Sequence, residues 1–377
     1  MSVSAARVRE LALELVAVAS PTGDTAEVAR LYARRLEEIG MDVELLADVF
    51  PKTPTVVARL RGSSPGPTVV LNGHLDTVPI PHDPPRLDGD LVYGRGSADM
   101  KGALASAAEA VRAVRDGRPF GGEIVIVAIG LHEAPAGRGE DLEHLLRERG
   151  FTADAAVVCE LSANDVAVAH LGSATFEITV SRPGMPTHEL QTPPGTPHPL
   201  LAAARVVEAI RARAEELAAV EHPWVGAETY FLGELHGGDF YNRHPTTCRL
   251  VGTCRWASSN SLEAVEADFR ELLARVATQT GCEIDLDLKL VRAAYEIDPA
   301  HELVRALQES YREVTGAELR PVGIKVVADG ALFAEAGIPT VYHGPQGSGA
   351  HADVECVPVA ELVRAAEVYV ALLRRLL

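Results

Sequence analysis

The chain has 377 residues, of which 47% are hydrophobic and 23% are charged. This length is greater than one compact core usually accommodates, so two domains are expected. The formal net charge of -18 at pH 7 argues against a nucleic-acid partner, because phosphate recognition requires a basic face.

The first part of the chain alternates between helical and strand-like hydrophobic patterns. Some segments repeat apolar residues at helical spacing, whereas short continuous apolar runs are typical of strands buried on both faces. Strands that alternate with helices predict an α/β fold with a mostly parallel sheet covered on both faces. The expected elements are helices at 4–19 and 24–39, strands at 42–46, 55–60 and 68–71, a helix at 100–115, a strand at 123–129, a helix near 140–149 and a strand at 155–159.

The pattern changes after Gly172 and returns at about residue 294. Between these points the expected order is strand, helix, strand, strand, helix, strand, which is the ferredoxin-like α+β arrangement. We therefore predict an inserted domain at 172–293 within a larger domain formed by 1–171 and 294–377. The elements expected from here on are a strand at 173–181, a helix at about 199–218, strands at 228–235 and 246–256, a helix at 261–280, a strand at 283–290, a helix at 300–315, a strand near 320–326, a helix around 329–336, a strand at 340–342 and a helix at 358–376.

The cytoplasm is the expected location. The five cysteines are scattered without a CxxC pair, which favours a reducing compartment over a disulfide framework. Arg7, Arg9, Glu10 and Glu14 interrupt the apolar stretch near the N-terminus, unlike in a secretory signal peptide. No window approaches about 20 uninterrupted apolar residues, so neither a membrane span nor a membrane partner is expected.

A histidine and an aspartate follow the apolar strand at 68–71, in the run Asn72-Gly73-His74-Leu75-Asp76. In a parallel sheet, residues just beyond the carboxyl end of a strand line the ligand crevice. Residues two apart in extended chain point to the same side, and a histidine beside a carboxylate is typical of a metal ligand with its orienting partner. A solvated loop histidine explains this pair alone about equally well.

Glycines surround a second candidate, Asp99, which stands between Gly94, Gly96 and Gly102 before an alanine-rich segment. This pattern predicts a tight turn that presents one carboxylate. The alternative is that Asp99 caps the following helix. A carboxylate can serve two cations through its two oxygens, as a two-metal site requires.

Further predicted strand or loop ends also deliver a histidine or a carboxylate, and chance is a poor explanation for so many at one sheet edge. Nitrogen and carboxylate ligands together predict a metal site, with zinc as the expected ion. The contributing residues are His74 with Asp76, Asp99, His132 with Glu133, Glu160, and His351 with Asp353.

Four stretches of the sequence resemble motifs of the aminoacylase, carboxypeptidase G and succinyl-diaminopimelate desuccinylase family of zinc metallopeptidases. The resemblance extends over essentially the whole chain, and its first two motifs are highly specific. It implies a zinc-hydrolase fold with an inserted lid and dimerisation domain, and therefore a homodimer. The stretches are residues 73–79, 94–102, 159–160 and 350–355.

The resemblance also implies a role for each candidate metal ligand. Residues that match His74, Asp99 and Glu160 hold a first metal ion in the family, whereas Asp99, a glutamate and His351 hold a second. The residue that matches Asp76 orients the first histidine. The implied cofactor is zinc, as one or two ions, with cobalt as a substitute.

The sequence departs from the family pattern where two adjacent glutamates precede a glycine-rich stretch, because this chain reads His132-Glu133-Ala134. Counting back from Gly139 makes Glu133 the general base and puts Ala134 where the second-metal ligand belongs. The other register makes Glu133 the ligand and His132 the base. We prefer the first register because it needs no gap before Gly139. Under it, the second metal site lacks a ligand unless His132 or water supplies one.

The resemblance assigns roles to further residues outside the metal site. His188 matches a histidine that reaches across the dimer to stabilise the developing oxyanion. Asn242 and Arg255 match positions that bind the substrate carboxylate, for which an arginine fork is well suited. Gly344 is expected to approach the substrate backbone. The alternatives are a surface-loop histidine, a charge on a strand face for Arg255, and a plain turn at Gly344.

These features predict an enzyme that cleaves an amide bond of an N-acyl amino acid or of a short peptide with a free carboxylate. A metal-activated water would give its proton to Glu133, attack the carbonyl, and leave an oxyanion held by the metal and His188. No Gly-x-Gly-x-x-Gly turn is present, which argues against a nucleotide-binding protein. The main alternative, motivated by Ala134, is a non-hydrolytic or single-metal descendant that only binds metal or ligand.

Overall fold

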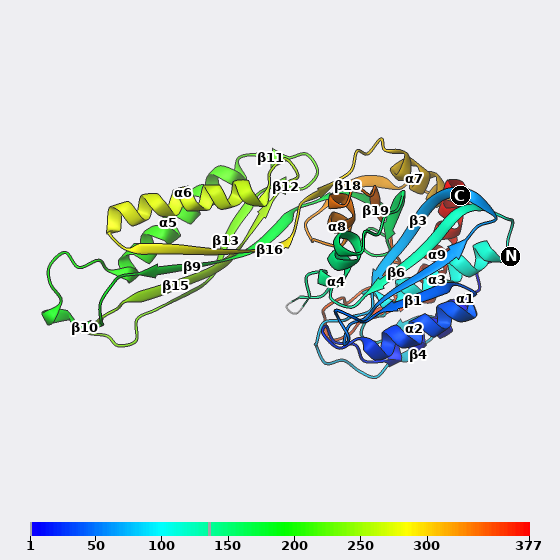
Figure 1. Cartoon of the computed structure of the whole chain (residues 1–377), viewed down its shortest axis with the longest axis horizontal. Coiled ribbons are helices and arrows are strands. Elements are labelled where there is room, and N and C mark those ends of the chain that lie inside the picture. Colours follow the sequence, from blue (N-terminus) through cyan, green and yellow to red (C-terminus); the bar gives the residue numbers. More distant parts are fainter. Residues whose placement is uncertain (1, 135–136) are drawn as a thin grey trace. The chain divides into compact units, whose positions relative to one another are not determined.

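The computed structural model describes residues 2–134 and 137–377, and the chain divides into two compact units. The second unit is inserted into the first, and it also includes a short segment from further along the chain. Figure 1 labels the elements of both units. Unit 1 comprises Met1–Val168, Ile297–Val322 and Ala328–Leu377, and unit 2 comprises Ala169–Glu296 and Gly323–Val327.

The strands of the main sheet are β1 (Asp42–Leu46), β2 (Thr55–Arg61), β3 (Ser64–His74), β6 (Gly121–Ile129), β7 (Ala155–Val158), β8 (Asp165–His170), β17 (Tyr295–Glu296), β18 (Arg320–Ile324) and β19 (Thr340–Tyr342). Within the described residues they form a nine-stranded sheet with the order β1-β2-β6-β3-β7-β19-β8-β17, and β18 pairs with β8. The central strands β6, β3, β7 and β19 are parallel, whereas their outer neighbours are antiparallel. The predicted α/β fold class is confirmed.

The central strands are buried, as their apolar runs predict. Val70 and Leu71 of β3 and residues 124–129 of β6 have no exposed surface. Val70 lies opposite Val125 of β6 on one side and Ala156 of β7 on the other, in parallel register. Because parallel strands end at the same edge of a sheet, the residues that follow β3, β6 and β7 meet there.

The helices of unit 1 are α1 (Ala5–Ala17), α2 (Ala26–Glu38), α3 (Lys101–Arg115), α4 (Glu140–Glu143), α7 (Glu302–Thr315), α8 (Gly330–Glu335) and α9 (Val359–Leu376). Helix α3 is almost completely buried, because its small alanine side chains allow α1 and α9 to pack closely against it. The predicted helix near 140–149 is instead one turn of α-helix, α4, followed by a π-helix over His144–Glu148.

A small sheet joins the segment before Asp99 to the segment after His351. Its strands are β4 (Arg86–Asp88), β5 (Leu91–Tyr93) and β20 (Cys356–Pro358), with β5 in the middle. Cys356 lies opposite Tyr93, and the N–H of the next residue, Gly94, donates to the carbonyl of Glu355 at 3.1 Å. This pairing fixes the spacing between two loops that are far apart in the sequence.

Unit 2 contains β9 (Gly172–Ser181), α5 (Pro199–Ala218), β13 (Thr229–Gly237), β15 (Thr247–Trp256), α6 (Leu262–Thr280) and β16 (Glu283–Arg292). The predicted ferredoxin-like order is therefore present, and the strands pair antiparallel in the order β13-β15-β9-β16. Phe176, Trp256 and Phe269 are almost fully buried in a core between this sheet and the two helices. Smaller elements are β10 (Thr187–His188) paired with β14 (Arg243–His244), β11 (Glu221–His222) paired with β12 (Gly226–Ala227), and a 3-10 helix over Glu189–Gln191. None of the described helices has the length and apolar character needed to cross a membrane.

Candidate metal centre

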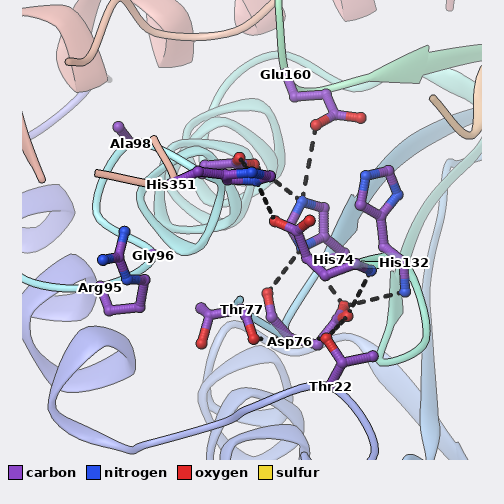
Figure 2. Close-up of polar contacts among 12 residues, drawn as sticks. Thr22, His74, Asp76, Thr77, Arg95, Gly96, Ala98, His132, Glu160 and His351 are labelled. Carbon is purple, nitrogen blue, oxygen red and sulfur yellow. Dashed lines mark hydrogen bonds and ion pairs between the residues drawn. The ribbon is translucent and has the colours of Figure 1, made fainter. Parts of the chain in front are cut away.

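Side chains from separate segments of unit 1 meet beyond the carboxyl ends of the parallel strands (Figure 2). His74 is the last residue of β3, and His132 and Glu160 follow closely after β6 and β7. Asp99 comes from the turn before α3, and His351 comes from the loop between β19 and β20. The segments that the sequence singled out as sources of metal ligands are thus brought together.

His74 is fully buried, and both of its ring nitrogens are directed at oxygen atoms. Nδ1 donates to the carbonyl oxygen of Asp76 at 2.9 Å, so Nε2 is the nitrogen that faces the site. Nε2 lies 3.1 Å from Oδ1 of Asp99 and 3.7 Å from Oε2 of Glu160. Burial lowers the pKa of His74, but hydrogen bonds with the carboxylates of Asp76, Asp99 and Glu160 outweigh burial and raise the pKa well above its ordinary value. Either a proton or a cation at Nε2 satisfies this arrangement.

Asp76 connects three parts of the chain around His74. Its carboxylate accepts hydrogen bonds from the Thr22 hydroxyl at 2.8 Å and from the backbone N–H groups of Glu133 and His132 at 2.8 and 3.3 Å. Burial would raise the pKa of Asp76, but its interactions with His74 hold the pKa below the ordinary value. Asp76 therefore fixes both the ring of His74 and the backbone that carries Glu133.

Asp99 lies between two imidazoles. Its Oδ1 faces Nε2 of His74, and its Oδ2 lies 3.5 Å from Nε2 of His351. Burial raises the pKa of Asp99, but hydrogen bonds with His351 and His74 outweigh burial and lower the pKa below its ordinary value. One carboxylate thus faces two groups of donor atoms, as a ligand shared by two cations does.

Glu133 lies beside His351, the second imidazole that Asp99 faces. Its Oε1 lies 3.1 Å from Nε2 of His351, whereas the neighbouring Ala134 is exposed and offers no donor atom. Burial raises the pKa of Glu133. The pKa of His351 rises to about 9, mainly through its hydrogen bond with Asp99. His351 also has a φ of 62°, which is uncommon for a residue other than glycine and typical of functional sites.

The donor atoms of this site fit a divalent cation. Among the described residues, ligand atoms of His74, Asp99 and Glu133 lie within 4.8 Å of one another, as do those of His74, His132 and Glu160. In the part of the chain that is described, the buried Oε1 of Glu160 has no hydrogen-bond partner, which is unfavourable for a carboxylate. Imidazole and carboxylate ligands suit zinc and related metals. The residues present therefore fit an ion of this kind.

His132 has a partner that the sequence did not reveal, namely Asp329. Nδ1 of His132 lies 2.9 Å from Oδ2 of Asp329, which immediately precedes α8. The His132 ring stacks on that of His74, with 4.2 Å between centroids and 4° between planes. Burial lowers the pKa of His132, but the Asp329 charge outweighs burial and raises the pKa to about 9. A lone aspartate before a short helix reads as a cap, so the sequence contained no signal for this pair.

A second group that sequence reasoning missed is the buried carboxylate of Glu355. It accepts backbone N–H groups from Gly96, Ala98 and Asp99 at 2.8–3.1 Å and an N–H of Arg95 at 2.9 Å. These bonds shape the turn that presents Asp99. The only sequence signal was the resemblance of residues 350–355 to a family motif.

The glycines around Asp99 are needed for backbone geometry and close packing. Gly96 has a φ of 89°, which side chains other than glycine rarely allow. A Cβ atom on Gly102 would lie 2.2 Å from the carbonyl oxygen of Ser97. The glycine-rich pattern thus folds the chain back on itself immediately before α3.

A cavity of about 400 Å³ lies beside Asp99 and Glu160, within unit 1. Its other walls are residues 161–163 and the loop 345–350. Gly344, which precedes this loop, packs so closely against Glu160 that a Cβ atom would lie 2.8 Å from the Glu160 Cα. Cavities of this size accommodate small molecules.

The other candidate residues lie elsewhere. His188 is exposed and Asn242 is half-buried in unit 2, where Nε2 of His188 lies 3.1 Å from Nδ2 of Asn242. Arg255, also in unit 2, donates to the carbonyl of Lys325 at 3.2 Å. Asp353 is exposed in unit 1 and has no contact with the site among the interactions of the described residues.

An α/β sheet with a histidine and carboxylate centre at its parallel edge defines a metallohydrolase. The chain belongs to Peptidase family M20/M25/M40, whose profile matches residues 70–375. The family prediction is thereby confirmed, and the chain is a metal-dependent amidohydrolase or peptidase.

Individual relatives extend over nearly the whole chain. An N-formyl-4-amino-5-aminomethyl-2-methylpyrimidine deformylase of Halalkalibacterium halodurans is 28% identical and covers 91% of this chain and 87% of its own length. A succinyl-diaminopimelate desuccinylase of Nitrosomonas eutropha is also 28% identical, with 97% of each chain covered. The crystal structure of aminopeptidase PepT from Bacillus cereus has a TM-score of 0.85 at 21% identity and covers 99% of both chains. A dinuclear metal binding peptidase of the M20 family from Bacillus subtilis has a TM-score of 0.76 at 16% identity, again with 99% of both chains covered.

Proposed function

We propose that the chain is a deacylase or carboxypeptidase-like enzyme that hydrolyses the amide bond of an N-acyl amino acid or of a short peptide with a free carboxylate. The observation that carries this proposal is the position of Asp99, whose two oxygens face His74 and His351. Relatives named as a deformylase and as a desuccinylase support an acyl group on nitrogen as the group removed. The cavity beside Asp99 has a size that suits such a substrate.

The proposed ligands of a first metal ion are His74, Asp99 and Glu160. The proposed ligands of a second ion are Asp99 and His351. Zinc is the proposed ion, with cobalt as a substitute, because the donors are imidazoles and carboxylates. When bound, such a metal lowers the pKa of a water molecule and polarises a carbonyl oxygen.

Asp76 and Glu133 are the proposed partners of these ligands in the reaction. Asp76 holds His74 with Nδ1 as a donor, so that Nε2 faces the site. Glu133 accepts the proton of the attacking water and returns it to the leaving amine. The sequence left open another role for Glu133, as a ligand of the second ion. The 3.1 Å contact between Glu133 and His351 supports this role. The variants that separate these roles are described in the Discussion.

The predicted inserted domain at 172–293, which lies within unit 2, is proposed to act as a lid and dimerisation domain. His188 is assigned to stabilise the oxyanion in the partner subunit of a homodimer, and Asn242 and Arg255 are assigned to the substrate carboxylate. Gly344 is assigned to the substrate backbone. Exposure of His188 supports its assignment because a residue that serves a partner must be accessible.

The cytoplasm is the proposed location of the enzyme. All five cysteines are free, and the side chains of Cys159, Cys248, Cys254 and Cys282 are buried in the two units. Free cysteines persist in a reducing compartment.

The experiment that tests this function measures metal content and hydrolysis together. Purified protein is analysed for bound metals and is assayed with N-formyl, N-acetyl and N-succinyl amino acids and with dipeptides. We expect hydrolysis of at least one class, loss of activity after chelation, and recovery with zinc or cobalt. Asp99→Ala should remove both metal and activity, whereas Asp353→Ala, which changes a nearby exposed aspartate, should retain both. Full zinc content in Asp99→Ala would show that Asp99 is not a shared ligand.

A further inference from the structure

Asp329 is a buried carboxylate whose side chain is directed at the site without being one of the proposed ligands. Its side chain is 1% exposed, and its Oδ2 lies 2.9 Å from Nδ1 of His132. Although Asp329 occupies the cap position before α8, its side chain makes no capping hydrogen bond. Burial of a carboxylate is unfavourable unless hydrogen bonds compensate it, so the pairing with His132 requires an explanation beyond local helix structure.

The pairing determines which edge of the His132 ring faces the site. An ionised carboxylate only accepts hydrogen bonds, so Nδ1 of His132 must be the protonated nitrogen. Nε2 is then the nitrogen on the opposite edge, and no hydrogen-bond partner is found for it among the described residues. In the neutral ring, this Nε2 is an acceptor.

His132 is badly placed to share a metal ion with His74, even though ligand atoms of both lie within 4.8 Å of an oxygen of Glu160 and of each other. A metal bound to an imidazole nitrogen lies in the plane of that ring. The two rings are stacked, with 4.2 Å between centroids and 4° between planes, so their planes are nearly parallel and the two Nε2 atoms do not converge on one point. Nε2 of His132 is therefore left for the reacting molecules rather than for the metal.

We infer that Asp329 is a positioning residue of the hydrolase: it holds the His132 ring so that Nε2 faces the attacking water and forms a hydrogen bond with it. This inference rests on the proposed function, because it needs a water that attacks an amide carbonyl. His132 orients this water, and Asp329 keeps the ring from turning or changing tautomer. The same tautomer control by a second carboxylate is common for histidines in catalytic sites.

The inference is tested by nitrogen NMR of zinc-loaded protein labelled at histidine nitrogens. We expect His132, identified by the loss of its signals in His132→Asn, to carry a proton on Nδ1 that is hydrogen-bonded to Asp329. Asp329→Asn should produce a mixture of tautomers. A wild-type ring with no proton on Nδ1 would overturn the inference.

Kinetics provide the second readout. Asp329→Asn should lower kcat by about 10- to 100-fold with little change in KM and no loss of zinc. The kcat of the double variant Asp329→Asn/His132→Asn should be no lower than that of His132→Asn alone, because both changes remove the same interaction. The matched control is Asp141→Asn, which alters an equally buried aspartate that accepts the N–H of Gly130 and should leave the His132 signals unchanged.

The outcomes separate this inference from the proposed function. If the wild-type protein hydrolyses no substrate in the panel but His132 keeps the Nδ1-protonated form, the proposed function fails and the placement by Asp329 stands. If hydrolysis is observed and Asp329→Asn changes neither the tautomer nor kcat, the positioning role is wrong while the proposed function survives.

Discussion

The backbone N–H of Asp99 donates to the carboxylate of Glu355 at 3.0 Å, although the two residues are 256 positions apart in the sequence. Glu355 also pairs with Arg95 at 2.9 Å, and both side chains are almost fully buried. Glu355 belongs to the loop that carries His351. One carboxylate therefore ties the turn that presents Asp99 to the loop that presents His351, and these are the two residues proposed to hold the second ion.

Replacement of Glu355 should damage both stability and metal binding. Glu355→Ala leaves the Arg95 guanidinium buried without its ionic partner, so the free energy of unfolding should fall by about 3–5 kcal/mol. The turn that carries Asp99 loses its acceptor at the same time, so zinc content should fall as well. Urea unfolding and elemental analysis measure the two effects. Asp353→Ala, two residues away but exposed, should change neither quantity.

The parts of the fold that could be predicted are those governed by local hydrophobic pattern. The apolar run at 68–71 corresponds to β3, and the alternation at 173–181 corresponds to β9. A strand buried on both faces has a continuous apolar run, whereas a strand buried on one face alternates between apolar and polar residues. The same logic located His74 and Glu160, since residues after parallel strands necessarily gather at one edge. Glycines around Asp99 indicated a turn for the same local reason.

What could not be predicted depends on contacts between distant segments. Asp329 and Glu355 act on the site through hydrogen bonds to residues about 200 or more positions away, and no local pattern encodes such partners. Strand β8 (Asp165–His170) was not predicted, because it is a short apolar segment that forms a strand by pairing with β19. The helix expected near 140–149 changes to a π-helix at His144, which helical periodicity alone does not distinguish.

Glu109 should make stability depend on pH at a place remote from the metal centre. Its carboxylate accepts hydrogen bonds from Arg7 of α1 at 3.0 Å and from Arg112 at 2.7 Å, and so connects α1 to α3. Burial would raise the pKa of Glu109, but the hydrogen bonds with Arg112 and Arg7 outweigh burial and lower the pKa to about 2. Since the folded pKa lies below the unfolded value of about 4.3, Glu109 contributes stability above that pH, and the contribution is lost as pH falls toward 2.

The corresponding measurement compares urea unfolding of the wild type and Glu109→Gln at several pH values. The wild type should be more stable than the variant at pH 7, and the difference should shrink steadily below about pH 4. Glu10→Gln, at an exposed position of α1, is the control and should show no such dependence. A difference that is the same at pH 7 and pH 3 would contradict the assigned interaction.

Dimer formation should depend on apolar side chains around His188. Met185, Leu190 and Tyr241 are 77%, 86% and 89% exposed in unit 2, and exposed apolar groups of this kind commonly mark an interface. We expect the chain to sediment as a dimer at micromolar concentration and Leu190→Asp to shift it toward monomer with reduced activity. Val49→Asp, which adds the same charge at an exposed apolar position of unit 1, should leave the dimer intact. A fully active monomer would exclude the role assigned to His188.

The role of Glu133 is the most consequential assignment at the metal centre, because the structure and the preferred register emphasise different functions. The register aligns Glu133 with the general base and Ala134 with a metal ligand. In the structure, Oε1 of Glu133 lies 3.1 Å from His351, and Ala134 is exposed. A proton acceptor and a metal ligand respond differently when the carboxylate is replaced by an amide of the same shape.

Glu133→Gln separates these roles when turnover and metal affinity are measured together. If Glu133 is the general base, the variant should keep its metal while turnover falls by at least about 10²–10⁴-fold, the usual contribution of general-base catalysis. If Glu133 is a ligand, metal binding should weaken and excess zinc should partly restore turnover. Ala134→Glu is the complementary change, and under the preferred register it should tighten binding of the second ion. Loss of metal in Glu133→Gln together with no effect of Ala134→Glu would reject that register and make His132, held by Asp329, the candidate base.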